Sequence, residues 1–289
     1  MIIAGASVQG TAHLATGQGC QDAFKAIGLG DTAVLAVSDG ASSRDRSALG
    51  AHIAVDAACR LLSEDIPEAE ETPEAWTRWI AGRGKRVAEE YRRAVTGVLG
   101  ASGSQGPGAL AATLTAAVVN PPWVAFASIG DCFGTLLTRA TVPAERARGT
   151  ARLTPTHPHA PTTDTTQSPE APPTDRCHLV LPPPTTPPVF LSSPSAELRI
   201  RTFVVWEPEL SGVVLATDGC AALTLDHPSV RQLPPEAGPL PAERFFLGLA
   251  ATLRENHGDA EPLRRRLSGP QAGRTGDDLT VLCALVEGG

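Results

Sequence analysis

Residues 33–40 read AVLAVSDG, an apolar run that ends in Asp39 and Gly40. A run this apolar predicts a strand that is buried on both faces. Three more aspartates lie at the edges of similar runs, in the strings GCQDAF, GVVLATDGC and RTGDDLTVLCALV; they are Asp22, Asp218 and Asp277. These residues are too far apart in sequence for one local loop. They form a carboxylate cluster if the strand ends converge in the fold.

Such a cluster predicts a cation site. Carboxylates held close together repel one another strongly unless cations lie between them. The strings around these aspartates contain no pair of Cys or His ligands, and oxygen ligands alone suit hard divalent ions such as Mg²⁺ or Mn²⁺. Taken singly, each aspartate is also consistent with a turn residue or the N-cap of a helix.

The length, apolar content and net charge of the chain limit the classes of protein to which it can belong. The 289 residues are 42% hydrophobic and carry a net charge of −7. This length fits one large domain or two small ones, and the apolar content is enough for a sizeable core. The acidic balance argues against a nucleic-acid-binding surface. No segment resembles a signal peptide or a membrane span of about 20 apolar residues. We therefore expect a cytoplasmic protein that binds neither nucleic acid nor membrane.

The apolar patterns predict alternating groups of strands and helices. Strands are expected at 2–8, 33–38, 110–119, 123–129, 199–205, 212–217 and 279–286, and helices at 45–63, from 72 onward and at 241–256. Gly130-Asp131, between two apolar runs, predicts a tight hairpin. Half of the 26 prolines fall in 141–195, which predicts an insertion into the single domain 1–289, with one short strand near 176–181.

Five strings, in this order, resemble the metal-dependent type 2C serine/threonine protein phosphatases, especially a divergent bacterial branch. They are CQDAF (20–24), AVSDGASS (36–43), FASIGDCFGTLL (126–137), LATDGCAAL (215–223) and TGDDLTVL (275–282). The resemblance implies an α+β fold, a four-layer α-β-β-α sandwich of two antiparallel sheets flanked by helices. It also implies a metal cleft at one end of the sandwich and a flap within the Pro/Thr-rich segment 141–195.

The resemblance implies a dinuclear centre built on the aspartates. Asp39 bridges both ions, and the carbonyl of Gly40 binds the second ion. By the same resemblance, Asp218 and Asp277 would complete the ligand set of the first ion, and Asp22 would act at the second ion through ordered waters.

Two further acidic residues extend this set. Asp131 matches a position that helps to hold a third ion in bacterial relatives. Asp278 replaces the Asn that usually follows the last metal-binding aspartate, and we expect it to share the role of Asp277.

The substrate side departs from the family pattern. Many relatives carry an arginine before the first acidic motif that contacts the substrate phosphate, and residues 9–17 contain none. His13 is the nearest cationic candidate, and we expect it to contact phosphate or to protonate the leaving group; the alternative is a hydrogen-bonded surface histidine. Arg44 and Arg46 are further candidates for phosphate contact, with a solvated first helical turn as the alternative.

The predicted function is a Mn²⁺- or Mg²⁺-dependent phosphatase that acts on phosphoserine and phosphothreonine in proteins. Two cations about 3.5–4 Å apart lower the pKa of a bridging water, and the resulting hydroxide attacks phosphorus directly. The expected partners are phosphorylated proteins and a serine/threonine kinase, in a signalling role. The alternatives are a phosphatase-like regulatory or binding module with little or no activity, and a phosphatase of a small phosphoester.

Overall fold

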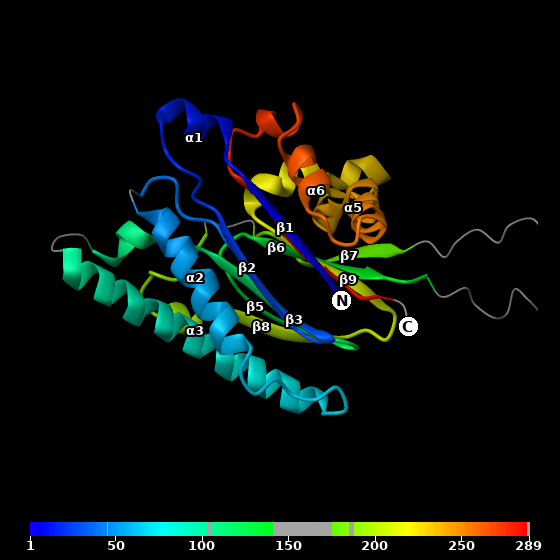
Figure 1. Ribbon diagram of the computed structural model, residues 1–289, viewed down its shortest axis with the longest axis horizontal. Helices are drawn as coiled ribbons and strands as arrows, with labels where there is room; N and C mark the ends of the chain where they lie inside the picture. The colour runs from blue at the N-terminus through cyan, green and yellow to red at the C-terminus, as the bar shows by residue number, and fades with distance from the viewer. Residues whose placement is uncertain (45, 103–105, 141–174, 185–187, 288–289) are drawn as a thin grey trace, which may run out of the picture.

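The computed structural model describes residues 1–44, 46–102, 106–140, 175–184 and 188–287 (Figure 1). In these ranges, strands form two five-stranded sheets in which every neighbouring pair is antiparallel. The first sheet has the order β1 (Ile2–Val8), β12 (Leu279–Leu285), β9 (Leu210–Ala216), β6 (Phe133–Thr138) and β7 (Arg176–Leu181). The second sheet has the order β2 (Ala23–Leu29), β3 (Thr32–Ser38), β4 (Leu114–Asn120), β5 (Trp123–Ile129) and β8 (Arg201–Trp206).

Helices cover the outer face of each sheet. Helices α2 (Ser47–Leu62) and α3 (Pro73–Ser102) pack on the second sheet, and α5 (Glu243–Glu255) and α6 (Glu261–Leu267) pack on the first (Figure 1). Buried apolar residues form one cluster under each helical layer and a third between the sheets. These observations confirm the α-β-β-α sandwich.

Strand β3 shows why its sequence is apolar throughout. Its side chains alternate between two buried surfaces, as the twofold periodicity of a strand requires. Val34 and Ala36 face the α2 and α3 layer, whereas Ala33, Leu35 and Val37 face the other sheet. The predicted burial on both faces is confirmed, and it places Asp39 where the strand leaves the core.

The predicted helix starts agree with the structure to within two residues. The Thr72 hydroxyl accepts a hydrogen bond from the Ala75 amide at 3.3 Å, and Pro73 occupies the first turn of α3, where its missing N–H is tolerated. The sequence patterns did not predict β2, α6 or three short elements: α1 (Thr11–Thr16), α4 (Ala221–Thr224) and the β10–β11 pair (Leu225–Asp226 and Leu240–Pro241). None of the helices in the described ranges is long and apolar enough to span a bilayer.

The predicted hairpin at Gly130-Asp131 is wrong. Strand β5 pairs with β4 and β8, whereas β6 pairs with β7 and β9, so this turn carries the chain from one sheet to the other. Two adjacent apolar runs indicate two strands, but they do not indicate which strands pair. Gly130 has φ +105°, and a Cβ there would lie 2.5 Å from the side chain of Thr113. The crossing therefore needs glycine.

Two described parts of the predicted insertion 141–195 pack against the sandwich. The short strand expected near 176–181 is confirmed as β7, which pairs with β6. Leu191 is fully buried, and its amide donates to the Ala112 carbonyl at 2.9 Å. The remainder of the predicted insertion, 141–174 and 185–187, lies outside the described residues.

Candidate metal centre

Three of the predicted aspartates meet at one end of the sandwich. Asp39 follows β3, Asp131 lies between β5 and β6, and Asp218 follows β9. Each of the three offers a carboxylate oxygen, and these oxygens lie within 4.8 Å of one another. The two sheets thus bring together carboxylates that are 87 to 179 residues apart in sequence. We refer to these three residues as the carboxylate group.

The backbone around Asp39 is held by Thr113, at the start of β4. The Asp39 amide donates to Thr113 Oγ1 at 2.9 Å, and the Thr113 amide donates to the Asp39 carbonyl at 2.8 Å. Asp218 begins a 3-10 turn, and its Oδ1 accepts from the Gly219 amide at 2.9 Å. The side chains are therefore presented from fixed turns, not from mobile loops.

Asp22 and Asp277 interact electrostatically with the carboxylate group, because the negative charge of each raises the pKa of Asp39. Asp22 is 5% exposed, and its Oδ2 accepts from Thr217 Oγ1 at 2.8 Å. Its Oδ1 is buried without a hydrogen-bond partner, and so is Asp131 Oδ1. A buried carboxylate oxygen without a donor is costly, and a cation would compensate for that cost.

The acidic side chains strongly perturb one another. Burial, reinforced by the charges of Asp22, Asp218 and other neighbours, raises the pKa of Asp39 to about 10. Burial likewise raises the pKa of Asp22 to about 7 and that of Asp218 to about 6, and raises the pKa of Asp131. Nearby divalent cations would favour the ionised forms and reverse these shifts. The atoms that could bind a cation here are carboxylate oxygens, and oxygen ligands suit hard divalent ions.

Gly40 is a position that no larger residue fits. A Cβ would lie 2.6 Å from the Ser47 carbonyl carbon and 2.9 Å from the Gln21 oxygen. The Gly40 amide donates to that Gln21 oxygen at 3.2 Å, and Gly40 forms an isolated antiparallel bridge with Ala112. The backbone after Asp39 is thus fixed by close packing on both sides.

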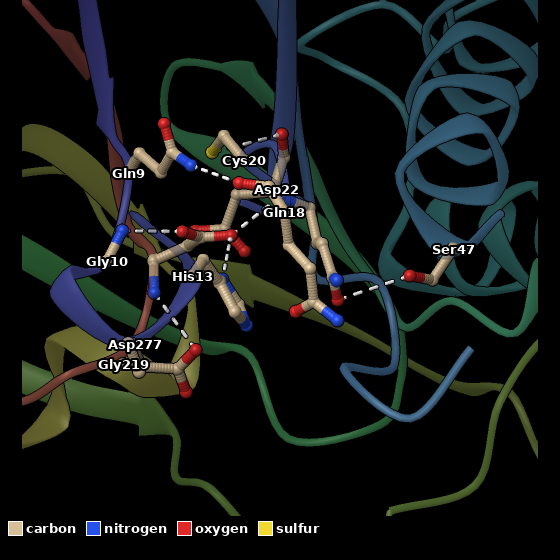
Figure 2. A network of polar contacts seen from close by, with 12 residues as sticks. Gln9, Gly10, His13, Gln18, Cys20, Asp22, Ser47, Gly219 and Asp277 are labelled. Atoms are coloured by element: carbon tan, nitrogen blue, oxygen red, sulfur yellow. Dashed lines mark hydrogen bonds and ion pairs between the residues drawn. The ribbon is translucent and has the colours of Figure 1, made fainter. Parts of the chain in front are cut away.

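The structure does not bring Asp278 into the carboxylate group. Asp278 is 2% exposed, and its two oxygens accept from the amides of Gly10 and Gln21, each at 2.6 Å. His13 lies on α1 and is also buried, with Nδ1 at 3.0 Å from Asp278 Oδ2 (Figure 2). That distance is typical of an ion pair, although the atoms are not aligned for a hydrogen bond.

Sequence reasoning missed the neutral residues that orient the aspartates. Thr113 and Thr217 hold Asp39 and Asp22, and Gln21 joins Asp278 to Gly40. Thr217 and Gln21 directly precede Asp218 and Asp22, but the residues that they contact lie elsewhere in the sequence. Thr113 had no local signal, because its partner lies 74 residues away in sequence.

Arg44, one of the candidates for phosphate contact, lies in the turn between β3 and α2 and is exposed. Arg46, the second candidate, directly precedes α2 and is partly buried. The described hydrogen bonds of Arg44 are backbone contacts with Ala41 and Ser47.

Comparisons with known proteins agree with this architecture. The sequence profile of the protein phosphatase 2C family matches residues 9–268. A comparison with curated protein sequences finds no match. A serine-threonine phosphatase 2C from Toxoplasma gondii is similar in structure, with a TM-score of 0.54 at 13% identity, covering 99% of this chain and 95% of that chain. A bacterial serine phosphatase bearing a point mutation gives a TM-score of 0.52 at 13% identity, covering 100% and 99%.

At such identities the solved structures support the fold alone. The profile match covers most of the chain and includes the strand ends that carry Asp22, Asp39, Asp131 and Asp218. The chain therefore belongs to the protein phosphatase 2C family.

Proposed function

We propose that this protein is a metal-dependent phosphatase that hydrolyses phosphoserine and phosphothreonine in other proteins. The observation that carries the proposal is the convergence of Asp39, Asp131 and Asp218, whose oxygens lie within 4.8 Å of one another. Membership of the protein phosphatase 2C family supplies the reaction class. Carboxylates this close need cations, and a phosphate ester needs the same neutralisation before a nucleophile can approach it.

We propose that this end of the sandwich holds two hard divalent cations and a third, weaker one; the oxygen-only group of Asp39, Asp131 and Asp218 supports a site for such cations. We propose that the ligands are oxygen atoms of the residues at the strand ends: Asp39, Gly40, Asp218 and Asp277 at the pair, with Asp22 beside it and Asp131 at the third. When bound, such a pair lowers the pKa of a water molecule and neutralises phosphoryl charge. Mn²⁺ and Mg²⁺ both suit an oxygen-only site.

We propose that His13 acts on the substrate. Its Nδ1 lies 3.0 Å from Asp278 Oδ2, and this leaves Nε2 as the ring nitrogen for a phosphate oxygen or the leaving group. His13→Ala is then expected to lower kcat/KM for a phosphothreonine peptide at saturating Mn²⁺. An unchanged kcat/KM in that variant would remove His13 from this role.

Phosphorylated proteins of the cytoplasm, together with the serine/threonine kinases that modify them, are the partners that we propose. The family membership supports a phosphoprotein substrate. It does not by itself select one kinase or one substrate sequence.

One assay tests the proposal. Hydrolysis of an aryl phosphate and of a phosphothreonine peptide is measured with Mn²⁺ and with a chelator, for the wild type and for Asp39→Asn. We expect turnover that requires the metal and is abolished by Asp39→Asn, because this substitution removes a central carboxylate. Asp175→Asn is the matched control, since Asp175 is bonded to Arg254 and Ser211 and takes no part in the proposed centre.

The two alternative functions predict different outcomes of this hydrolysis assay. A binding module would retain folding and Mn²⁺ affinity without hydrolysing either compound. A phosphatase of small phosphoesters would hydrolyse the aryl phosphate and leave the phosphopeptide intact.

A further inference from the structure

Asp278 is a buried carboxylate near the proposed metal centre, and each of its two oxygens accepts a hydrogen bond. Its Oδ1 accepts from the Gly10 amide and its Oδ2 from the Gln21 amide, both at 2.6 Å, and His13 Nδ1 lies 3.0 Å from Oδ2. Short hydrogen bonds between an ionised carboxylate and backbone N–H groups are the strong, charge-assisted kind. Figure 2 shows the network in which Gly10 and His13 lie next to the turn at Asp277.

The two amides lie at the two ends of one segment, residues 10–21, which contains α1. The same segment is attached to the turn before β12 at two more points: the Ala12 amide donates to the Gly276 carbonyl at 3.0 Å, and Thr11 Oγ1 donates to the Gly273 carbonyl at 3.1 Å. Gly10 packs so closely that a Cβ would lie 2.4 Å from the Asp277 carbonyl carbon. Asp278 thus closes segment 10–21 into a loop held against the last metal-binding turn.

Gln21 extends this connection into the centre. Its carbonyl accepts from the Gly40 amide at 3.2 Å, and its Oε1 accepts from Ser47 Oγ, at the first residue of α2, also at 3.2 Å. Asp22 is the next residue. Gln21 therefore contacts Gly40 and directly precedes Asp22, and both of these residues belong to the proposed metal site.

We infer that Asp278 is a positioning residue, which holds segment 10–21 in place and thereby sets Asp22 and Gly40 at the correct position relative to Asp277. Both of its oxygens are already committed to backbone amides, so its contribution to metal binding passes through Gln21 and not through direct coordination. The inference rests on the proposed function, because it assigns the residue to that same metal centre.

Asp278→Asn is the direct test, since Asn keeps the shape but replaces one acceptor oxygen by an NH₂ donor that must face a backbone N–H. Two quantities are measured: amide hydrogen exchange of residues 10–21 in the metal-free protein, and the Kd for Mn²⁺ by titration calorimetry. We expect faster exchange across 10–21 and a Kd raised about 10- to 100-fold, the usual effect of removing a group that orients metal ligands.

Asp175→Asn is again the matched control, because Asp175 Oδ2 also accepts two hydrogen bonds, from Ser211 Oγ and Arg254 Nη1 at 2.7 and 2.9 Å, but outside the centre. It is expected to leave both the exchange of 10–21 and the Mn²⁺ affinity as in the wild type. His13→Ala provides a milder variant that keeps both amide bonds of Asp278, and a smaller increase in exchange is expected there.

Unchanged exchange of residues 10–21 in Asp278→Asn would overturn the inference, because the segment would then not depend on the carboxylate. Faster exchange with an unchanged Mn²⁺ affinity would overturn it as well, since Asp278 would then serve the fold alone. If Asp278→Asn fails to fold, the same two measurements are made on Asp278→Glu, which keeps the charge but moves both oxygens away from the amides of Gly10 and Gln21. A wild-type protein that turns over substrate while the Asp278 variant binds Mn²⁺ normally refutes this inference alone, whereas a wild type without Mn²⁺ binding or turnover refutes the proposed function.

Discussion

Asp39 is the residue at which the electrostatic cost of this centre is greatest. It lies against Asp131 and Asp218, and its pKa of about 10 reflects burial first and the neighbouring carboxylates second. Without cations, such a group favours the protonated form, and ionising it opposes folding. The same repulsion favours cation binding once ions are present. Ionisation of the metal-free site therefore costs stability, and bound cations would offset that cost.

This cost predicts a pH dependence of the metal-free protein. The folded-state pKa values of Asp218 and Asp22 are about 6 and about 7, against an ordinary value of 3.8. A raised folded-state pKa adds stability that is complete below the unfolded pKa and is lost as the pH rises through the folded pKa. In the presence of a chelator, we therefore expect the Tm, followed by circular dichroism, to fall from about pH 4 to about pH 7.

Mn²⁺ should reverse this trend, because it binds the ionised carboxylates and so raises the Tm more at pH 8 than at pH 5. Asp218→Asn serves as the control and should make the metal-free profile less steep, since Asp22 still contributes. A metal-free Tm that rises between pH 5 and pH 8 would contradict the assignment of these shifts.

At the scale of elements, helices α2 and α3 show how packing overrides helix propensity. Gly50 in α2 lies where a Cβ would meet the Leu110 oxygen at 2.2 Å and the Tyr91 hydroxyl at 3.1 Å. Gly82 in α3 is open to solvent, with nothing within 4 Å of a Cβ. One glycine permits close approach of a helix to the η1 turn, Pro107–Leu110, and the other merely weakens its helix.

The two glycines predict opposite effects of the same substitution. Gly50→Ala is expected to destabilise the fold by about 1–3 kcal/mol, because overpacking outweighs the gain in helix propensity. Gly82→Ala is expected to stabilise it by about 0.5–1 kcal/mol, because there only the propensity term remains. Urea unfolding of both variants provides the measurement, and destabilisation by Gly82→Ala would show that α3 is constrained there by something other than propensity.

At the scale of the whole molecule, the core between the two sheets holds the centre together, since Asp39 follows a strand of one sheet, whereas Asp218 follows and Asp277 precedes strands of the other. Phe126 on β5 is fully buried in this layer and stacks on Phe203 of β8 with ring centroids 4.9 Å apart. A rigid layer of this kind keeps the two halves of the site at a fixed separation.

Phe126→Ala is therefore expected to lower the free energy of unfolding by about 3–5 kcal/mol through the cavity that it leaves. Trp206→Ala is the control, since this aromatic side chain on β8 is 58% exposed and should cost far less. Chemical denaturation measures both losses. Similar losses for the two variants would indicate that the layer between the sheets does not dominate stability.

Most of the strands, helices α2, α3 and α5, and the aspartates beside the strands can be predicted from local sequence patterns. Burial on both faces leaves a local trace in AVLAVSDG, and Thr72-Pro73 is a local signal for the start of α3. These features depend on residues within a few positions of one another, so their pattern predicts them without knowledge of the fold.

The way these elements combine depends on contacts between residues far apart in the sequence. Gly130-Asp131 crosses between sheets instead of closing a hairpin, because strand pairing depends on contacts that periodicity does not record. Asp278 binds the amides of Gly10 and Gln21 across separations of 268 and 257 residues, although it stands directly beside a predicted metal ligand. Local pattern reports whether a residue is buried or ends a strand, whereas the partner of a buried polar group is fixed by packing between distant segments.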